Sequence, residues 1–566
     1  MKIIDYYNYI AAAAFALMGV AAVIIAFFGK KDKSTEKEIS DKLAFIGLLM
    51  ITAVATFLRL YKLGAIPYGL QQDEASLGYD AFCLATKGID RNGYAYPIYP
   101  ITWGCGGGSP LMIYLNVISI KLFGTGVVKL RMLPAVCGIA TVFLFFFALK
   151  KSFGNKMSLL GTAFLALCPW HVILSRWSLD SNIMPFVMLI PMLLFMKAHK
   201  SGKTGTFCLS AALYGLCMYS YGSANIVIPL HLLLICTYCL IDRSLKWKQL
   251  FLSAIAFIVV CLPLGVFYAV NYLGLPEIIT DVVCFNKFTA SRTGEVFLSG
   301  NQALLPQIVS NLKVLIKVMT IGDSSDMVCH YIPGFSTLFE FTFPLTGIGI
   351  LLGIIGLFDK KKDRGEKCSD ALWLSMFVSC VALGIVISTD ISRMVMIFLP
   401  LIFFFVKGTE FVCFNIRKGG LVIGVATLIA AVMFIKSYFT DFNSISSYIF
   451  MPEYGEAMAK AYEIAGDDRP IYSTYKDLSA PFALALYYTN YDPDKFYTSV
   501  IYKDPDAEFR IARSYGNFTF DYLPEDLENG GFDDTVFVAE KGEFEDIDIT
   551  SDFKIVDAGK YVVFYK

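Results

Sequence analysis

Asp73 and Glu74 are neighbouring carboxylates in a polar segment that directly follows a hydrophobic run ending near Leu60. A carboxylate at the edge of a membrane protein can take a proton from a substrate hydroxyl and so act as a general base. The same pair would also suit the first turn of a helix over residues 74–86, because anions are favourable at a helix N-terminus. Residue type and spacing alone leave both roles open for the pair.

The overall composition places these carboxylates in a membrane protein. Of the 566 residues, 56% are hydrophobic and 17% are charged, whereas about 25% of the residues in a soluble domain are charged. The mean hydropathy is +0.58. The formal net charge is zero and the sequence contains no nucleic-acid-binding motif. The predicted partner of the chain is therefore the lipid bilayer, and no nucleic acid is expected.

Twelve apolar runs are long enough to cross a bilayer, since a helical span needs about 20 residues. The first run lacks a basic segment before it, so we expect it to be retained and not cleaved as a signal peptide. The segment 110–123 is shorter, and we interpret it as a helix at the membrane surface. The predicted spans are residues 7–28, 43–60, 127–149, 157–174, 182–198, 206–222, 226–241, 249–270, 337–358, 370–388, 394–411 and 421–438.

Lysine and arginine residues between the spans predict the orientation, because positively charged links face the cytoplasm. Basic links alternate with links poor in net positive charge, as twelve crossings require. Both termini, the loops 61–126 and 271–336 and the tail 439–566 are then extracytoplasmic, in a multi-pass protein of the cell membrane. The basic links are residues 30–42, 150–156, 199–203, 243–248, 360–367 and 417–418.

The tail from residue 439 is polar and acidic, unlike the rest of the chain. Runs rich in β-branched and aromatic residues predict strands at 470–474, 535–539 and 560–564, and a helix is expected over 481–488. We interpret the tail as a small α/β domain that packs on the outer loops as a lid or scaffold. The predicted fold class is an all-α polytopic membrane domain, residues 1–438, followed by this α/β domain, residues 439–566.

The segment from Arg59 to Pro97 carries an ordered set of motifs. It reads Arg-x-Tyr-x-Leu-Gly-x-Ile-Pro-x-Gly-Leu-x-x-Asp-Glu-Ala, then Gly78-Tyr79-Asp80-Ala81 and Thr86-Lys87-Gly88-Ile89-Asp90-Arg91-Asn92-Gly93. This set resembles bacterial relatives of the protein O-mannosyltransferases, which are glycosyltransferase family 39 in the GT-C superfamily, and the aminoarabinose transferases that modify lipid A. The resemblance extends to about residue 410 through Phe123-Gly124, Arg131-Met132-Leu133-Pro134, Pro169-Trp170-His171, Ser175-Arg176, Asp180, Arg393-Met394 and Pro400.

The resemblance implies an inverting glycosyltransferase. Such an enzyme moves a hexose or pentose from a polyprenyl-phosphate carrier to an acceptor hydroxyl on the extracytoplasmic face. Asp73 would be the base that deprotonates the acceptor, and Glu74 would bind sugar hydroxyls or orient the acceptor. The acceptor class stays open among glycan, lipid and protein. The resemblance predicts neither a cofactor nor a metal-ligand set.

The leaving phosphate of such a donor requires cationic partners near the outer surface. Arg393 is the first candidate, because the related enzymes carry an arginine near the donor phosphate at this place, and Arg176 is the second. Alternatively, Arg176 pairs with Asp180 at i, i+4, and Arg131 extends to the membrane interface. The full set of candidate cations is Arg59, Lys62, Arg131, Arg176, Lys287, Arg292 and Arg393.

Other residues carry weaker predictions. Asp80 lies seven residues after Asp73, so a helix would place both on one face; it supports the site or is a solvated loop carboxylate. Trp103 stacks on a sugar ring or belongs to an interfacial aromatic belt. The 14 cysteines show no metal-binding spacing. We interpret most of them, including Cys236 and Cys239, as small core residues.

The alternative function is a transporter or flippase for a lipid-linked sugar or polysaccharide. Such a protein would place charges within its spans and would contain paired broken helices. The predicted spans are nearly free of charge, and the polar residues concentrate in the outer loops, which favours an enzyme. An oligosaccharyltransferase-like member of the superfamily is also disfavoured, because Asp-x-Asp occurs only in the tail and Trp-Trp-Asp does not occur.

Overall fold

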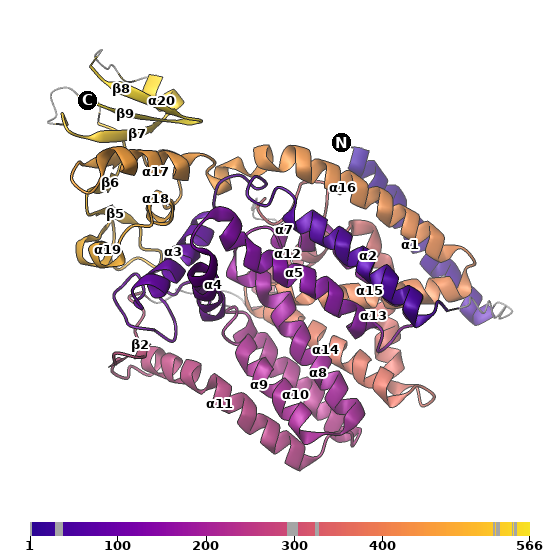
Figure 1. Ribbon diagram of the computed structural model, residues 1–566. Coiled ribbons are helices and arrows are strands. Elements are labelled where there is room, and N and C mark those ends of the chain that lie inside the picture. Colours follow the sequence, from indigo (N-terminus) through magenta and orange to yellow (C-terminus); the bar gives the residue numbers. More distant parts are fainter. Residues whose placement is uncertain are drawn as a thin grey trace.

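The computed structural model describes residues 3–28, 38–290, 304–322, 328–524, 527, 532–545, 547 and 552–566. In this part of the chain a large helical bundle continues into a small tail that contains a β-sheet (Figure 1). Ten segments are long and apolar enough to cross a membrane. They are α1 (Ile3–Phe28), α2 (Asp41–Leu60), α5 (Val127–Leu149), α8 (Met184–Ser201, preceded by the 3-10 turn η1, Asp180–Ile183), α10 (Ala224–Ile241), α11 (Trp247–Tyr272), α13 (Phe343–Phe358, preceded by η2, Glu340–Thr342), α14 (Arg364–Val386), α15 (Phe398–Asn415, preceded by η3, Val395–Ile397) and α16 (Gly419–Phe450).

The two remaining predicted spans are shorter than expected. The predicted span 157–174 is divided into α6 (Asn155–Leu167) and α7 (Pro169–Leu174). Pro169 cannot donate a backbone hydrogen bond and disfavours helical geometry at the residue before it, so Cys168 is extended and the helix is interrupted. The predicted span 206–222 corresponds to α9 (Thr204–Cys217), which has only 14 residues. The prediction of one continuous helix was therefore wrong at 157–174, whereas the helix predicted at 206–222 is present and ends earlier than expected.

The described residues of the outer loops form three helices. Helices α3 (Gln72–Thr86) and α4 (Pro110–Phe123) agree with the helices expected at 74–86 and 110–123, and they pack on each other. Helix α12 (Leu304–Thr320) was not predicted, because Lys313 and Lys317 interrupt its apolar residues, which lie on one face. The short strands β1 (Ile278–Ile279) and β2 (Cys284–Phe285) pair as an antiparallel hairpin.

Helix α16 continues past residue 438 as far as Phe450 and leads directly into the tail. Buried residues recur at every fourth position, Tyr438, Phe442, Ser446 and Phe450, so one face of the helix keeps packing where the sequence turns polar. The tail then forms a seven-stranded sheet in the order β4-β5-β6-β3-β7-β9-β8. Its elements are α17 (Tyr454–Ala465), β3 (Ile471–Ser473), α18 (Pro481–Thr489), α19 (Pro493–Ser499), β4 (Ile501–Tyr502), β5 (Ala512–Tyr515), β6 (Phe518–Phe520), β7 (Val536–Glu540), α20 (Lys541–Glu545), β8 (Lys554–Ala558) and β9 (Tyr561–Tyr565).

The sheet confirms the three strands and the helix that the sequence predicted in the tail. Strand β3 is parallel to both of its neighbours, β6 and β7, with Ile471 opposite Phe518 on one side and Val536 on the other. The outer pairs of the sheet are antiparallel. A central strand with parallel neighbours must be covered on both faces, and α17 lies against β3, β7 and β9.

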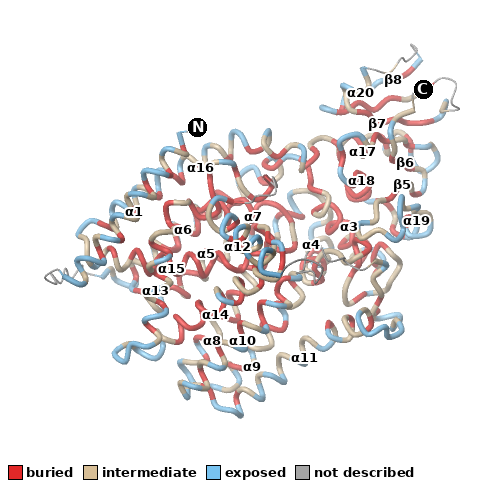
Figure 2. The backbone as a smooth tube through the Cα atoms, turned by 180° about the vertical axis from the view of Figure 1, so that it is seen from behind, coloured by how far each residue is buried: buried red, intermediate tan, exposed pale blue. Residues whose placement is uncertain are grey.

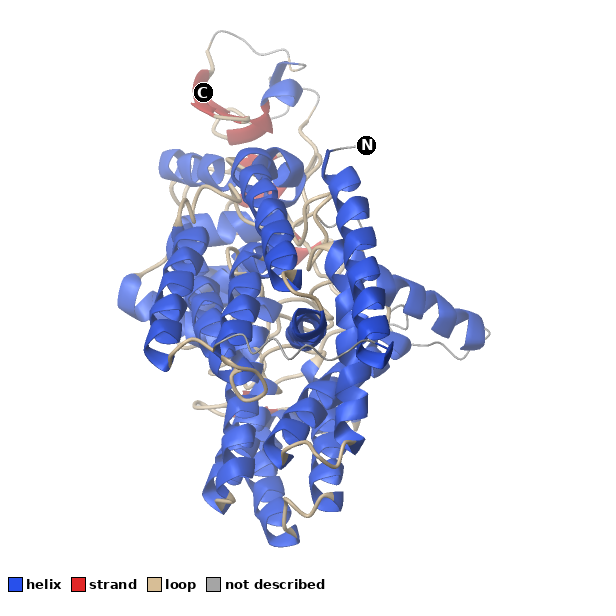
Figure 3. Cartoon of the chain, turned by 90° about the vertical axis from the view of Figure 1, so that its right-hand side faces the viewer, coloured by secondary structure: helices blue, strands red, loops and turns tan. Residues whose placement is uncertain are grey.

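The basic links gather at one end of the bundle. Hydrogen bonds join residues that lie in these links or directly beside them: Asn155 to Ile39, Ser152 to Ser369, and Gln249 to Gly202. At the other end of α1, Asn8 donates to the carbonyl oxygen of Gly334 at 3.1 Å, which ties the N-terminus to the second outer loop. In Figure 3 the N-terminus and the sheet of the tail lie at the same end of the molecule. The basic links therefore lie at one end of the bundle, and the links poor in net positive charge lie at the other end.

The burial pattern is that of a protein surrounded by lipid. Helix α15 is buried over most of its length, whereas α1 and α11 are largely exposed and intermediate (Figure 2). The exposed side chains of α11 are apolar and include Phe251, Ile258, Val259 and Leu262. An apolar surface of this size is costly in water and is favourable in a bilayer, so the helical part of the chain is a multi-pass membrane domain.

Candidate functional site

Asp73 and Glu74 lie in the first turn of α3, but neither side chain caps the helix. The side-chain oxygen Oε1 of Gln71 accepts hydrogen bonds from the backbone N–H groups of both residues, and Gln71 is thus the N-cap. The Nε2 group of Gln71 also donates to Oδ2 of Asp73 at 3.1 Å. Asp73 is half-buried and Glu74 fully buried. The two adjacent carboxylates therefore have different environments.

Glu74 points into the protein and is fully occupied there. Arg131 of α5 donates from Nε to Oε1 at 2.7 Å and from Nη2 to Oε2 at 2.9 Å. The backbone N–H of Ser178 also donates to Oε1, at 2.8 Å. Both side chains of the ion pair have 0% exposure. A carboxylate that accepts from three protein donors and is fully enclosed positions α3 and is closed to a substrate.

Two buried arginines hold the segment that leads into α3. Besides Glu74, Arg131 donates to three backbone carbonyls of residues 63–69, and Arg176 donates to four carbonyls of residues 58–66 and to the hydroxyl of Tyr438. Each guanidinium donates to several backbone oxygens at or just after the end of α2. The motif around residues 59–75 therefore specifies a rigid turn that fixes where Asp73 stands.

Gly69 completes this turn by a close approach to α16. Its φ angle is +87°, and a Cβ atom at this position would lie 2.1 Å from the carbonyl oxygen of Phe450. Only glycine tolerates this backbone conformation and this distance without a shift of one of the chains. The ring of Phe450 also lies over the guanidinium of Arg131. The end of α16 thus closes over the ion pair that positions α3.

Arg59 is also enclosed. Its Nη1 group donates to the carbonyl oxygens of Ala55 and Ala166, and its Nη2 group lies 2.6 Å from Nδ1 of His171. Arg59, Arg131 and Arg176 each have an exposed fraction of 0%. The expected alternatives are not seen either: among the described residues Arg176 makes no ion pair with Asp180, and Arg131 does not reach outward. All three arginines serve to hold the backbone in this structure.

Among the described candidate arginines, Arg393 is partly exposed, with 26% of its side chain accessible. Its Nε group lies 3.3 Å from Oδ2 of Asp390, and its Nη1 group donates to the carbonyl oxygen of Ser388. The neighbouring Ser392 hydroxyl is 3.0 Å from Nε2 of His330. Of the other candidates, Lys62 is exposed, Lys287 lines a cleft, and Arg292 lies outside the described residues.

A chain of contacts connects Arg393 to the start of α3. His330, beside Ser392, packs its ring against Trp177 at a centroid distance of 5.3 Å. The residue after Trp177 is Ser178, whose backbone N–H donates to Glu74. Arg393 and Asp73 are 320 residues apart in the sequence. The contacts through His330 and Trp177 connect the segments that carry them, and we call these connected segments the site wall. Loop 271–336 supplies the central residue of this wall.

Asp180 is a carboxylate whose proximity to Asp73 the sequence did not indicate. The two carboxylates lie close enough for their charges to repel each other. The backbone N–H and the hydroxyl of Ser109 both donate to Oδ2 of Asp180, at 3.0 Å and 2.6 Å. Asp73 therefore interacts electrostatically with a carboxylate from a distant part of the sequence. The polar stretch around residues 178–182, between two apolar runs, was the signal available in the sequence.

Asp80 is neither a solvated loop carboxylate nor exposed to a substrate. Its Oδ1 accepts from Nε of Arg91 at 2.5 Å, and its Oδ2 accepts from the hydroxyl of Thr102 at 2.6 Å. Arg91 also donates to the carbonyl oxygen of Ser76 on α3. Asp80 therefore anchors the long loop that follows α3. In the same loop, burial raises the pKa of Asp90 to about 7.

Trp103 lies against the tail. Its ring makes edge contacts with Phe482 of α18 and with Phe509, at centroid distances of 6.2 Å and 6.1 Å. Only 7% of the residue is exposed. The hydroxyl of Ser479 donates to the side-chain oxygen of Gln72, in the first turn of α3. The tail therefore packs on the first outer loop beside the candidate base, as the lid or scaffold interpretation requires.

A cleft of about 240 Å³ lies between the first outer loop, the segment around residue 287 and the tail. Three cations line it, Arg91, Lys287 and Arg510, together with aromatic residues such as Tyr94, and no carboxylate of the described chain belongs to its lining. The Nη1 group of Arg91 and the Nε group of Arg510 are buried and make no hydrogen bond to any described residue. Both residues therefore bring a donor without a protein acceptor to the lining of the cleft.

Comparison with known proteins gives the family context. Residues 108–267 match the dolichyl-phosphate-mannose-protein mannosyltransferase family. A mannosyltransferase-like protein of Bacillus subtilis (strain 168), YycA, is 24% identical over 169 residues. That match spans 30% of this chain and 24% of the relative, so the chain aligns with about a quarter of that protein's length.

Solved structures extend the similarity to nearly the whole chain. The crystal structure of ArnT from Cupriavidus metallidurans bound to undecaprenyl phosphate has a TM-score of 0.54 at 12% identity, covering 93% of this chain and 98% of that chain. The oligosaccharyltransferase of Archaeoglobus fulgidus in its apo form has a TM-score of 0.45 at 11% identity, covering 80% of this chain and 64% of that chain. The chain is a multi-pass membrane protein that shares the fold of the ArnT structure, and its residues 108–267 are similar to the protein mannosyltransferases.

Proposed function

We propose that this glycosyltransferase moves a sugar from a polyprenyl-phosphate carrier to an acceptor hydroxyl, with inversion at the anomeric carbon. The observation that carries the proposal is the arrangement at the start of α3. Asp73 is partly exposed there, on a turn that buried arginines hold and beside a tail that covers it. The family match and the ArnT structure bound to undecaprenyl phosphate support a lipid-linked donor. A mannosyl donor is the first to test.

Asp73 acts as the general base in this proposal. It takes the proton of the acceptor hydroxyl while the acceptor oxygen bonds to the anomeric carbon and the bond from that carbon to the phosphate oxygen breaks. Proton transfer by a positioned side chain contributes about 10²–10⁴-fold to a rate. The charge of nearby Asp180 favours this step, because repulsion between two carboxylates is relieved when one of them accepts a proton.

Arg393 receives the charge of the departing carrier phosphate. It is the partly exposed arginine of the site wall, and an arginine presents paired donors that match phosphate oxygens. Asp390 and the carbonyl oxygen of Ser388 orient its guanidinium. Arg59, Arg131 and Arg176 are positioning residues in this proposal, and Glu74 works through Arg131 and not on the sugar.

The cationic cleft receives a negatively charged part of the acceptor. Arg91 lines the cleft and donates to Asp80 and Ser76 of α3, so the cleft and the candidate base share one helix. Asp80 lies seven residues after Asp73, which corresponds to about 10 Å along a helix. A glycan of a few sugars covers that distance. Tyr94 and the other rings of the cleft supply faces for sugar stacking.

The membrane orientation is part of the proposal. The end of the bundle that carries the basic links faces the cytoplasm, as positively charged links do. The other end, with α3 and the tail, then faces the extracytoplasmic side, where lipid-linked sugars serve as donors. Cysteine labelling at an engineered position next to Asp73 in intact cells tests this orientation: labelling by a membrane-impermeant reagent supports it, and labelling only after lysis contradicts it.

A transporter is the second candidate because a cluster of charged side chains lies within the spans. Asp370 of α14 is fully buried and pairs with Lys407 of α15 at 2.6 Å and with Lys362. Lys362 belongs to a basic link, so this cluster lies toward the basic end of the bundle rather than midway along it. Its charges are paired with one another, as a structural network would require.

Donor turnover by the purified full-length protein separates the two functions. The protein is incubated with a panel of polyprenyl-phosphate sugars, and release of polyprenyl phosphate is measured for wild type and for Asp73→Asn. Asp281→Asn, which removes an exposed carboxylate of the second outer loop, serves as the matched control. Turnover by wild type and the control, with loss in Asp73→Asn, supports the enzyme. Equal turnover in all three proteins removes Asp73 as the base.

A further inference from the structure

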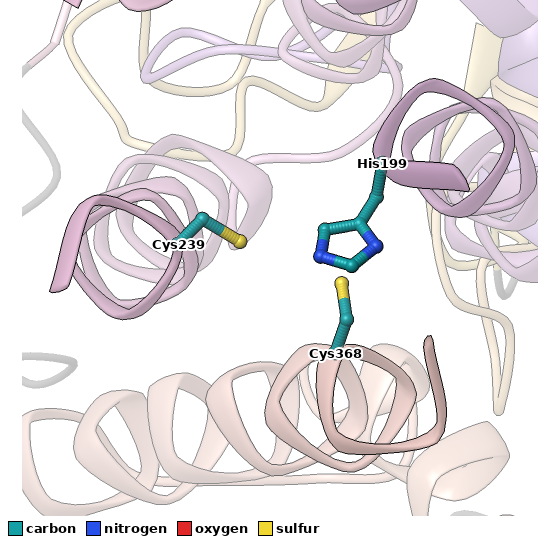
Figure 4. A group of neighbouring side chains, drawn as sticks. All are labelled: His199, Cys239 and Cys368. Carbon is teal, nitrogen blue, oxygen red and sulfur yellow. The ribbon is translucent and has the colours of Figure 1, made fainter. Parts of the chain in front are cut away.

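Three side chains that could bind a metal ion converge at the basic end of the bundle. His199 lies near the end of α8, Cys239 near the end of α10, and Cys368 in the second turn of α14. One potential ligand atom from each lies within 4.8 Å of the others. Figure 4 shows both thiols pointing toward the imidazole ring, from two different helices. None of these residues belongs to the site around Asp73.

The two thiols interact with each other, and Cys239 also interacts with Ser244. The Nε2 atom of His199 is buried and has no hydrogen-bond partner among the described residues. Cys239 and Cys368 have exposed fractions of 0% and 2%. Cys239 and Cys368 are not joined to each other as a disulfide. A buried imidazole nitrogen aimed at two buried thiols is an arrangement that a soft cation would satisfy.

Asp242 is an acidic residue near the cluster, outside the group of ligand atoms that lie within 4.8 Å of one another. This half-buried carboxylate, in the turn after α10, interacts electrostatically with His199, Cys239 and Cys368. Two thiolates, an imidazole and a carboxylate are the ligand types that zinc takes in proteins, at about 2.0–2.3 Å and in tetrahedral geometry. Arg364 also faces His199 and contributes a positive charge. The link 360–367 therefore supplies a cation beside an otherwise anionic cluster.

We propose that His199, Cys239 and Cys368 bind one Zn²⁺ ion, with Asp242 or a water molecule in the fourth position. Binding converts the two thiols to thiolates and releases their two protons to solvent, and no electron is transferred. The ion joins the ends of three helices, so its role is structural. Under the proposed orientation the site faces the cytoplasm, where thiols stay reduced. Spacing along the chain could not indicate it, because each ligand comes from a different helix.

Metal analysis of the purified full-length protein tests the proposal. Zn²⁺ is supplied to wild type, Cys239→Ser, Cys368→Ser and His199→Ala. Loosely bound metal is then removed, and the zinc content of each protein is measured by elemental mass spectrometry. Cys236→Ser is the matched control, because Cys236 lies on the same helix and lines a separate apolar cavity with Phe207 and Tyr214. About one zinc per chain in wild type and in the control, with a loss of at least tenfold in the three variants, supports the site.

A second measurement uses wild type alone and so does not depend on the folding of the variants. Zinc is removed with a chelator, Zn²⁺ is restored to half of the sample, and the alkylation rate of each cysteine is followed by peptide mass spectrometry. Protection of Cys239 and Cys368 by at least tenfold, with Cys236 unchanged, supports the site. Wild type that binds no zinc, equal alkylation with and without Zn²⁺, or a Cys239–Cys368 disulfide in the freshly purified protein overturns it.

Discussion

Glu74 and Arg131 are joined by two parallel hydrogen bonds, at 2.7 Å and 2.9 Å, and both side chains are fully enclosed. This pair separates the functions of two adjacent carboxylates. Glu74 fixes the start of α3 from inside the protein, while Asp73, one position earlier, stays partly exposed. The base that we propose therefore depends on a neighbour that never meets the substrate.

Breaking this pair should destabilise the protein. In Glu74→Gln, Arg131 keeps its charge without a counterion in a site closed to water, and removal of one partner of a buried pair typically costs about 3–5 kcal/mol. The thermal unfolding temperature in detergent should fall clearly, and turnover should fall with the folded fraction. The matched control is Asp557→Asn, which removes one partner of the exposed pair with Lys541 and should leave the unfolding temperature unchanged. Equal unfolding temperatures for both variants would contradict the role assigned to Glu74.

Arg393 and Arg176 should respond differently to replacement by alanine. Arg393→Ala should raise the KM for the lipid-linked donor by about 10–100-fold, since a hydrogen bond to a charged group contributes about 1.5–3 kcal/mol. Its unfolding temperature should match that of wild type. Arg176→Ala should instead lower the unfolding temperature, because it leaves buried carbonyl oxygens unpaired.

Steady-state kinetics on a donor series together with a thermal melt check this pair of predictions. Arg417→Ala, which removes an exposed arginine at the basic end of the bundle, is the control for charge alone. A donor KM that does not change in Arg393→Ala would remove this residue from the phosphate site.

Asp90 should make the stability of the first outer loop depend on pH. Burial raises its pKa to about 7, whereas an aspartate in an unfolded chain has a pKa of about 3.9. Between these values the folded state binds one proton more than the unfolded state, so stability falls as the pH rises from about 4 to 7 and then levels off.

Asp90→Asn should remove this dependence. The asparagine oxygen can still accept from the backbone N–H groups of Asn92 and Tyr94, and its side chain carries no charge to desolvate. Unfolding temperatures measured from pH 5 to pH 8 should therefore decline less for Asp90→Asn than for wild type or for Asp281→Asn. Parallel profiles for all three proteins would show that Asp90 does not titrate in this range.

The cationic cleft should affect the acceptor and not the donor. Arg510→Ala removes a cation whose Nε is buried and without a hydrogen-bond partner in the described chain. With a negatively charged acceptor, KM should rise by about tenfold for the loss of one charged hydrogen bond, while donor KM stays constant. A neutral acceptor should show no change. Equal effects on both acceptors would assign Arg510 a structural role, in which its stacking on Tyr502 at 4.8 Å matters more than its charge.

Local sequence patterns were sufficient to locate most of the helices and strands. Apolar runs located the spans, because a bilayer requires an uninterrupted apolar segment of fixed length. Alternating basic links grouped these segments into two ends, and contacts such as Asn155 to Ile39 agree with that grouping. The predictions were wrong where a local interruption was overlooked, as at Pro169, and incomplete where packing on one face stabilises a helix that is not apolar throughout, as in α12.

The sequence by itself determined the membrane domain, the α/β tail and the position of Asp73 at the start of a helix, because each follows from periodicity or composition within a few residues. Only the tertiary structure decided which side chains meet. Glu74 and Arg131 are 57 residues apart, Asp73 has Asp180 as its neighbour, and three helices bring His199, Cys239 and Cys368 together. Such contacts depend on how whole helices pack against one another, and no local pattern in the sequence predicts that packing.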